Sequence, residues 1–79
     1  MNLTIRYFAA FRELTGVEVE AVNSEASSPS ALFRECAARH DALQKFTSSM
    51  VAVNDEMVSW DSTLSEGDVV LFFPPVAGG

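Results

Sequence analysis

The last eight residues, Phe72 to Gly79 (FFPPVAGG), combine residue types suited to chemistry at a chain end. Pro74 and Pro75 hold the base of this segment in an extended course, because proline fixes φ and cannot donate to a sheet ladder. Gly78 and Gly79 have no side chain, so they can enter a channel too narrow for other residues. The segment therefore suits a tail that presents its terminal carboxylate to the catalytic groups of another protein.

A frayed chain end is the alternative interpretation of the final two glycines, since most termini behave in that way. The apolar run directly before them favours a contact site, because a large exposed apolar surface usually marks an interaction. Part of Phe72 and Phe73 must also belong to the core. If the tail is functional, its reactive group is the terminal carboxylate and not a side chain.

Side chains outside the tail are weaker candidates for a catalytic or metal-binding site. Cys36 and His40 are four residues apart on an expected helix, so the pair could form a nucleophile or half a metal site. A small buried thiol beside a half-buried histidine is the favoured interpretation, because free cysteine is among the most buried residue types and zinc needs more ligands. Asp55 and Glu56 fit a turn better than an acid-base pair, and Asp68 is expected to brace a glycine turn.

Composition narrows the class of protein. The chain has 79 residues, 48% of them hydrophobic, with a net charge of -6, which suits one domain with a compact core. An acidic, apolar-rich protein fits a basic partner with a hydrophobic groove. Nucleic-acid binding is not expected, because the five basic residues are scattered: Arg6, Arg12, Arg34, Arg39 and Lys45.

The single cysteine excludes an internal disulfide, and the first ten residues (MNLTIRYFAA) lack the basic and long apolar regions of a secretory leader. No stretch approaches the ~20 apolar residues of a membrane span. A cytoplasmic location is therefore expected.

The elements that must position the tail begin with a strand at residues 2–8, where apolar and polar side chains alternate. Residues 9–14 favour a helical turn closed by Gly16, and residues 17–22 then predict a second strand that pairs with the first. Ser28 followed by a proline predicts a helix start. One face of that helix should pack on a sheet, and its members are Leu32, Phe33, Cys36, Ala37 and His40.

The second half predicts three short strands. Residues 50–53 and 57–60 flank the turn formers of residues 54–56 and indicate a hairpin, in which Met50, Met57 and Trp60 are expected to pack. The unbroken apolar run of residues 69–73 predicts a strand buried on both faces. The two prolines end this strand, so the remaining residues of the chain should leave the sheet.

Three stretches together resemble one known family. They are FAAFRELTG at residues 8–16, VAVN at residues 51–54, and LSEGDVVLFFPPVAGG at residues 64–79. They resemble the sulfur carriers of the MoaD/ThiS family, and within it the branch of molybdopterin synthase small subunits. The resemblance implies an α+β fold of the ubiquitin-like β-grasp type, with a mixed sheet of four to five strands packed against one main helix. It also implies a domain over residues 1–75 and a flexible diglycine tail over residues 76–79.

The resemblance further implies a mechanism in which this chain is a sulfur-donating subunit without acid-base groups of its own. A ubiquitin-activating-like enzyme would use ATP and magnesium to adenylate the Gly79 carboxylate, and a sulfurtransferase would then supply sulfur to form a thiocarboxylate. The large subunit of molybdopterin synthase, expected in a heterotetramer of two small and two large subunits, would pass the sulfur to cyclic pyranopterin monophosphate. The chain itself would bind no cofactor and no metal.

The residue roles implied by the resemblance centre on the tail. Gly79 would carry the sulfur and Gly78 would give steric access. The expected partner-binding residues are Phe73, Pro74, Pro75, Val76, Phe8 and Arg12.

Three other functions remain open at this point. A thiamine-pathway sulfur carrier shares the diglycine, and a ubiquitin-like modifier would join Gly79 to a lysine through the same adenylate. A β-grasp interaction module with an inert tail is the third. A shared fold cannot separate them, because function depends on the site.

Overall fold

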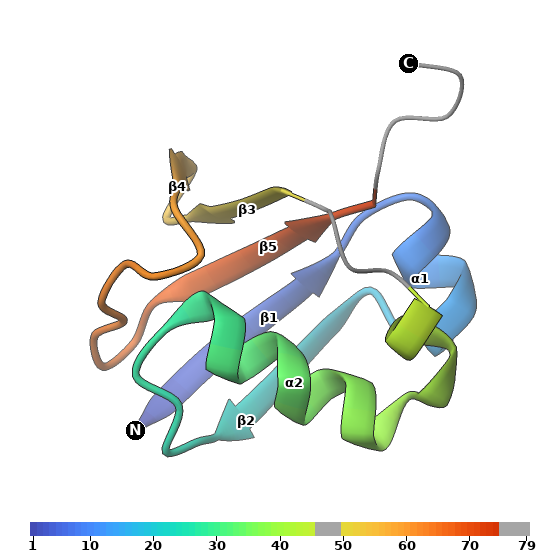
Figure 1. Ribbon diagram of the computed structural model, residues 1–79, viewed down its shortest axis with the longest axis horizontal. Coiled ribbons are helices and arrows are strands. Elements are labelled where there is room, and N and C mark those ends of the chain that lie inside the picture. The colour runs from blue at the N-terminus through green and yellow to red at the C-terminus, as the bar shows by residue number, and fades with distance from the viewer. Residues whose placement is uncertain (46–49, 75–79) are drawn as a thin grey trace.

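The computed structural model describes residues 1–45 and 50–74, which form a five-stranded sheet with one main helix across one face (Figure 1). The strand order is β2-β1-β5-β3-β4, and β1 runs parallel to β5 while the other neighbours are antiparallel. The expected mixed sheet against one main helix is confirmed. In chain order the elements are β1 (Asn2–Tyr7), α1 (Ala10–Thr15), β2 (Val19–Asn23), α2 (Pro29–Arg39), the 3-10 helix η1 (Asp41–Lys45), β3 (Met50–Val53), β4 (Glu56–Val58) and β5 (Val69–Phe73).

The first strand pair forms as the alternation predicts, with β1 paired to β2 along its length. β2 begins at Val19, two residues later than expected. Gly16 closes α1 in the left-handed region at φ 78°, and the Thr15 hydroxyl accepts a hydrogen bond from the Val17 N–H at 3.3 Å. This turn holds Val17 out of the ladder, which explains the later start.

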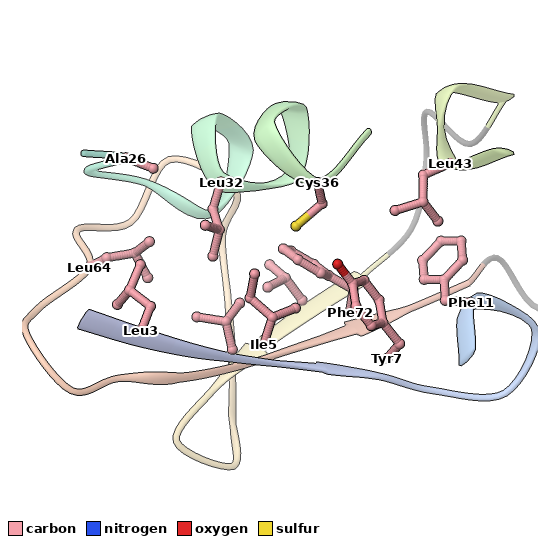
Figure 2. Packing of buried hydrophobic residues seen from close by; sticks show 12 residues of the cluster. Leu3, Ile5, Tyr7, Phe11, Ala26, Leu32, Cys36, Leu43, Leu64 and Phe72 are labelled. Carbon is pink, nitrogen blue, oxygen red and sulfur yellow. The ribbon is translucent and has the colours of Figure 1, made fainter. Parts of the chain in front are cut away.

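Helix α2 starts at the predicted cap. The Ser28 side chain accepts a hydrogen bond from the Ala31 N–H at 3.2 Å, and Pro29 occupies the first turn. Leu32 and Cys36 are fully buried and point from the helix to the sheet (Figure 2). The predicted helix face therefore packs on the sheet. The 3-10 helix η1 follows α2 directly, at Asp41–Lys45.

One core fills the space between α2 and the sheet. Trp60 stacks on Phe72 with ring centroids 5.8 Å apart, and Phe33 meets both rings edge-on. The expected packing of Trp60 is confirmed. The buried cluster comprises Leu3, Ile5, Tyr7, Phe11, Ala26, Leu32, Cys36, Leu43, Val51, Leu64, Val70 and Phe72.

The prediction that residues 69–73 are buried on both faces is wrong. Val70 and Phe72 have no exposed surface, whereas Val69 is 36% exposed and Leu71 and Phe73 are half-buried. β5 is the central strand of the sheet, but α2 covers one face only (Figure 1). The apolar run therefore has one face in the core and one face outside it.

The predicted hairpin joins β3 to β4 through Asn54 and Asp55, which both adopt positive φ values of 52° and 68°. Glu56 begins β4 rather than completing the turn. Met50 and Met57 are 49% and 54% exposed, so the expectation that they pack holds for Trp60 and is wrong for these two methionines. Within the described ranges, no helix is long and apolar enough to cross a membrane.

Candidate functional site

Only part of the predicted site lies within the described residues. Pro75, Val76, Gly78 and Gly79 lie outside the described residues. The described chain leads to them through β5 and Pro74, so the surface at the end of β5 is the part of the site that the structure describes.

The parallel pairing of β1 and β5 brings their carboxyl ends to the same edge of the sheet. Tyr7 is in register with Phe72, and the next residues along each strand, Phe8 and Phe73, place their rings 5.4 Å apart. Phe8 is 53% exposed. Two predicted partner-binding residues that are distant in sequence therefore form one aromatic contact beside the point where the tail departs.

The sheet face opposite α2 is apolar over much of its area. Cross-strand partners project to the same side, and the register aligns Arg6 with Leu71, Leu71 with Ala52, and Ala52 with Met57. Several of its apolar side chains are about half exposed, which is typical of a contact surface. This open face consists of Arg6, Phe8, Val19, Met50, Ala52, Met57, Val69, Leu71 and Phe73.

An open cleft of about 480 Å³ adjoins the aromatic contact. Arg12, expected to extend the docking surface, lines the same cleft as Phe8. Arg6 and Leu71 also line it and were not singled out from the sequence. The alternation of β1 could have indicated Arg6, because it marks the face opposite the core, but it does not show that Leu71 is its neighbour.

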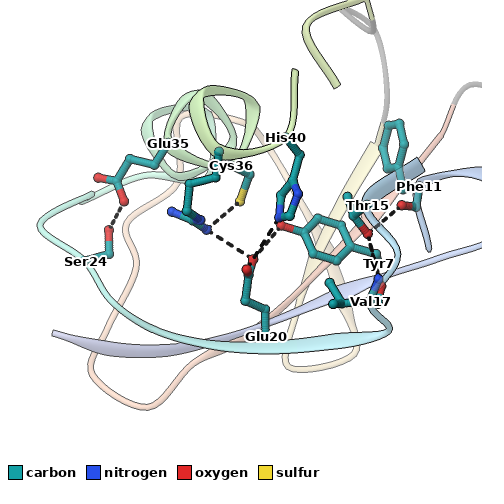
Figure 3. Close-up of polar contacts among 10 residues, drawn as sticks. Tyr7, Phe11, Thr15, Val17, Glu20, Ser24, Glu35, Cys36 and His40 are labelled. Atoms are coloured by element: carbon teal, nitrogen blue, oxygen red, sulfur yellow. Dashed lines mark hydrogen bonds and ion pairs between the residues drawn. The ribbon is translucent and has the colours of Figure 1, made fainter. Parts of the chain in front are cut away.

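The Cys36–His40 pair forms no catalytic arrangement. Cys36 is fully buried, which raises the pKa of its thiol, and its Sγ lies 3.6 Å from the Arg39 Nη2 donor. His40 directs Nε2 to Glu20 at 3.5 Å and packs edge-on against the Tyr7 ring (Figure 3). The favoured interpretation of a buried structural thiol is confirmed.

Glu20 is the centre of this polar cluster (Figure 3). Its Oε1 accepts hydrogen bonds from the Tyr7 hydroxyl at 2.8 Å and from Arg39 Nη2 at 3.2 Å. Burial opposes ionisation of Glu20, but the bonds from Tyr7 and Arg39 outweigh it and lower the pKa of the carboxyl. Burial raises the pKa of Tyr7, and contacts with Cys36 and Glu20 add to the rise. The cluster joins β1 and β2 to the end of α2, so its role is to stabilise the fold.

Asp68 braces the turn before β5, as expected. Its Oδ2 accepts from the Ser65 N–H at 2.8 Å and its Oδ1 accepts from the Asn54 side-chain amide at 2.9 Å. The Asn54 side-chain carbonyl oxygen in turn accepts from the Val69 N–H at 3.0 Å. These bonds set where β5 begins. In residues 1–45 and 50–74, no group of three or more His, Cys, Asp or Glu side chains could hold a metal ion.

Comparison with known proteins identifies the family. A model described as the ThiS family matches residues 5–79. The chain belongs to the ThiS family. A relative of this ThiS-family chain, the molybdopterin synthase sulfur carrier subunit of Escherichia coli (strain K12), is 38% identical over 81 residues, covering 98% of this chain and 99% of that protein.

Solved structures share the fold of this ThiS-family chain. SAMP1 from Haloferax volcanii matches with a TM-score of 0.83 at 22% identity, with both chains fully covered, and confirms the ubiquitin-like β-grasp fold. The complex of subunits 1 and 2 of the molybdopterin-converting factor from Helicobacter pylori 26695 contains a chain that matches with a TM-score of 0.68 at 25% identity, again with full coverage of both.

Proposed function

We propose that this chain is the sulfur carrier subunit of a molybdopterin synthase. The observation that carries the proposal is the aromatic contact of Phe8 and Phe73 on an open apolar face, directly beside the strand that leads to the tail. A carrier needs such a surface, because its partner must hold the body of the protein while the tail reaches the reacting atoms. Relatives that share 38% and 33% of their residues with this chain are molybdopterin synthase sulfur carrier subunits.

The chemistry takes place at the Gly79 carboxylate. A carboxylate is a poor electrophile, so an activating enzyme with ATP and magnesium converts it to an acyl-adenylate and releases pyrophosphate. The terminal sulfur of a sulfurtransferase persulfide displaces AMP, and a thiol then cleaves the sulfur–sulfur bond to leave a thiocarboxylate. The thiocarboxylate donates its sulfur to cyclic pyranopterin monophosphate within the large subunit, which supplies the acid-base groups.

The tail and the open face have different roles: the tail carries the reacting group, and the open face binds the partner. Gly78 gives the terminus access to a narrow channel, because glycine lets backbone approach closely. The large subunit covers the open face, and two small subunits assemble with two large ones; the Helicobacter pylori complex of subunits 1 and 2 supports a two-subunit assembly. The residues that we propose for docking are Phe73, Pro74, Pro75, Val76, Phe8 and Arg12.

The first experiment measures intact-protein mass after incubation with ATP, magnesium, a sulfurtransferase and the matching activating enzyme. A mass increase equal to one oxygen replaced by sulfur, located by fragmentation at Gly79, is expected. An unchanged mass, with the enzymes active on another carrier, would exclude the thiocarboxylate mechanism. Transfer to the pyranopterin precursor with the large subunit then separates this pathway from a thiamine-pathway carrier.

Deletion of Gly79 provides the matched control. The variant is expected to unfold cooperatively like the wild type, because the deletion does not touch the core. It is expected to accept no sulfur, because its terminal carboxylate, now on Gly78, is one residue short of the reacting position. Full sulfur transfer by the variant would contradict the proposed site. Stable conjugates between Gly79 and target lysines would instead favour a ubiquitin-like modifier.

A further inference from the structure

Two arginines from different elements line the cleft beside the aromatic contact. Arg6 projects from β1 and Arg12 from α1, and both are exposed. The ion pairs among the described residues join Glu20 to Arg39 and to His40, so neither cleft arginine has one there. Glu18 also lines the cleft, so two positive side chains face one negative side chain.

This local charge opposes the charge of the molecule. The whole chain has eleven acidic and five basic residues, yet two of those five basic residues meet here. Arg6 pairs across the sheet with Val19 and Leu71, which are apolar, so no carboxylate is directly opposite it in the strand register, and Glu18 is the acidic side chain that lines its cleft. Arginine and aromatic residues are both enriched at protein interfaces.

Docking would change the solvation of these arginines. A partner that covers Phe8 and Leu71 must also remove water from Arg6 and Arg12, because all four line the same cleft. A desolvated guanidinium is costly unless a carboxylate accepts its hydrogen bonds, and arginine matches the planar geometry of a carboxylate. The occupant that fits the cleft is therefore acidic and attached to an apolar surface.

We propose that the partner covering the open face inserts one aspartate or glutamate side chain into this cleft, where Arg6 and Arg12 hold its carboxylate. Apolar groups of the partner cover Phe8 and Leu71 around it. The acidic surface elsewhere favours approach of a partner that is basic overall, and the cleft then sets the orientation in which it docks. This inference rests on the proposed function, which makes that partner the large synthase subunit.

The test compares the affinity of the wild type and of three charge-reversal variants for the large subunit by titration calorimetry. Arg6→Glu and Arg12→Glu are expected to weaken binding by at least about tenfold, because each places a like charge against the partner carboxylate. Arg34→Glu is the matched control, since Arg34 is exposed on α2 and makes the same change in net charge. It is expected to bind like the wild type. Circular dichroism checks that each variant is folded.

The outcomes separate the inference from the proposed function. Equal binding by all four proteins would overturn the inference alone, whereas failure of the wild type to bind the large subunit would overturn the proposed partner and the inference together. A nucleotide phosphate is the competing occupant. In that case the free wild type binds inorganic pyrophosphate, and Arg6→Glu loses that binding while its affinity for the large subunit stays unchanged. That result would overturn the proposal that an acidic side chain of the partner occupies the cleft.

Discussion

At the scale of single residues, the polar cluster around Glu20 shows how hydrogen bonds favour the ionised form of a partly buried carboxylate. Its hydrogen bonds come from Tyr7 and Arg39, on two different elements, so the charge also joins the edge strand to α2. The cost of burial is offset only while those donors remain in place. The stability of the protein should therefore depend on the protonation of this one side chain.

Acid should weaken the fold through Glu20. The pKa of Glu20 in the folded protein lies below its ordinary value of 4.5, so as pH falls the unfolded chain takes up the proton first. This contribution to stability is present above pH 4.5 and is lost as pH falls through the folded-state pKa. Urea unfolding at a series of pH values measures it. Glu20→Gln should flatten the fall in stability at acid pH, and an unchanged fall in this variant would contradict the role of Glu20.

Gly67 tests backbone conformation separately from packing. Its φ is +84°, and a Cβ built there would meet no atom within 4 Å. Gly67→Ala is therefore expected to lower the free energy of unfolding by about 1 to 2 kcal/mol through strain alone. Gly67→Asn should lose less, because asparagine tolerates the left-handed region. Equal losses for both variants in urea unfolding would contradict this explanation.

At the scale of elements, alternate side chains of β5 pack in the core and lie on the open face. Phe72 points into the core, and Phe73, its neighbour, lies on the open face in contact with Phe8. The strand ladder enforces this division, because successive side chains point to opposite faces. Stability and docking can therefore be separated by substitution of adjacent residues.

Phe72→Ala is expected to destabilise the fold by about 3 to 5 kcal/mol, because it empties a fully buried site beside Trp60. Phe73→Ala should cost less stability and should weaken binding to the large subunit. Denaturant unfolding and calorimetric titration measure the two effects. A larger loss of stability for Phe73→Ala than for Phe72→Ala would contradict the assignment of faces.

At the scale of the whole molecule, the fold covers one face of its sheet and leaves the other open. α2 lies across the covered face (Figure 1). Aromatic residues pack with it there, whereas half-exposed apolar side chains remain on the open face. The parallel pair of β1 and β5 ends at an edge of that face. A partner that contacts the open face is thus held next to the departing tail.

Phe8→Ala tests that arrangement in the assembled complex. Phe8 is 53% exposed, so its truncation should cost about 0.5 to 1.5 kcal/mol of stability through loss of the Phe73 contact. The affinity for the large subunit should fall by at least about tenfold, because the substitution removes an exposed aromatic ring from the proposed docking surface. Leu14→Ala, at a residue that is 43% exposed outside the open face, is the control. Equal affinities for the two variants would argue against docking through this face.

Local sequence patterns were sufficient to identify the individual elements. The alternation of apolar and polar residues identified β1, and the Ser28 cap located the start of α2. The turn at Asn54 identified the hairpin. Each of these signals depends on neighbours within a few residues. The diglycine and its family resemblance indicated the chemistry. The tail itself remains a prediction, since Gly78 and Gly79 lie outside the described residues.

The surfaces that these elements form became visible only in the folded chain. The run of residues 69–73 is equally apolar on both sides, so burial of one face followed from where α2 lies and not from the run itself. Arg6 and Arg12 meet at one cleft because α1 folds back beside β1, and Glu20 finds Tyr7 through strand pairing. These contacts depend on side chains from separate elements, which local sequence patterns do not encode.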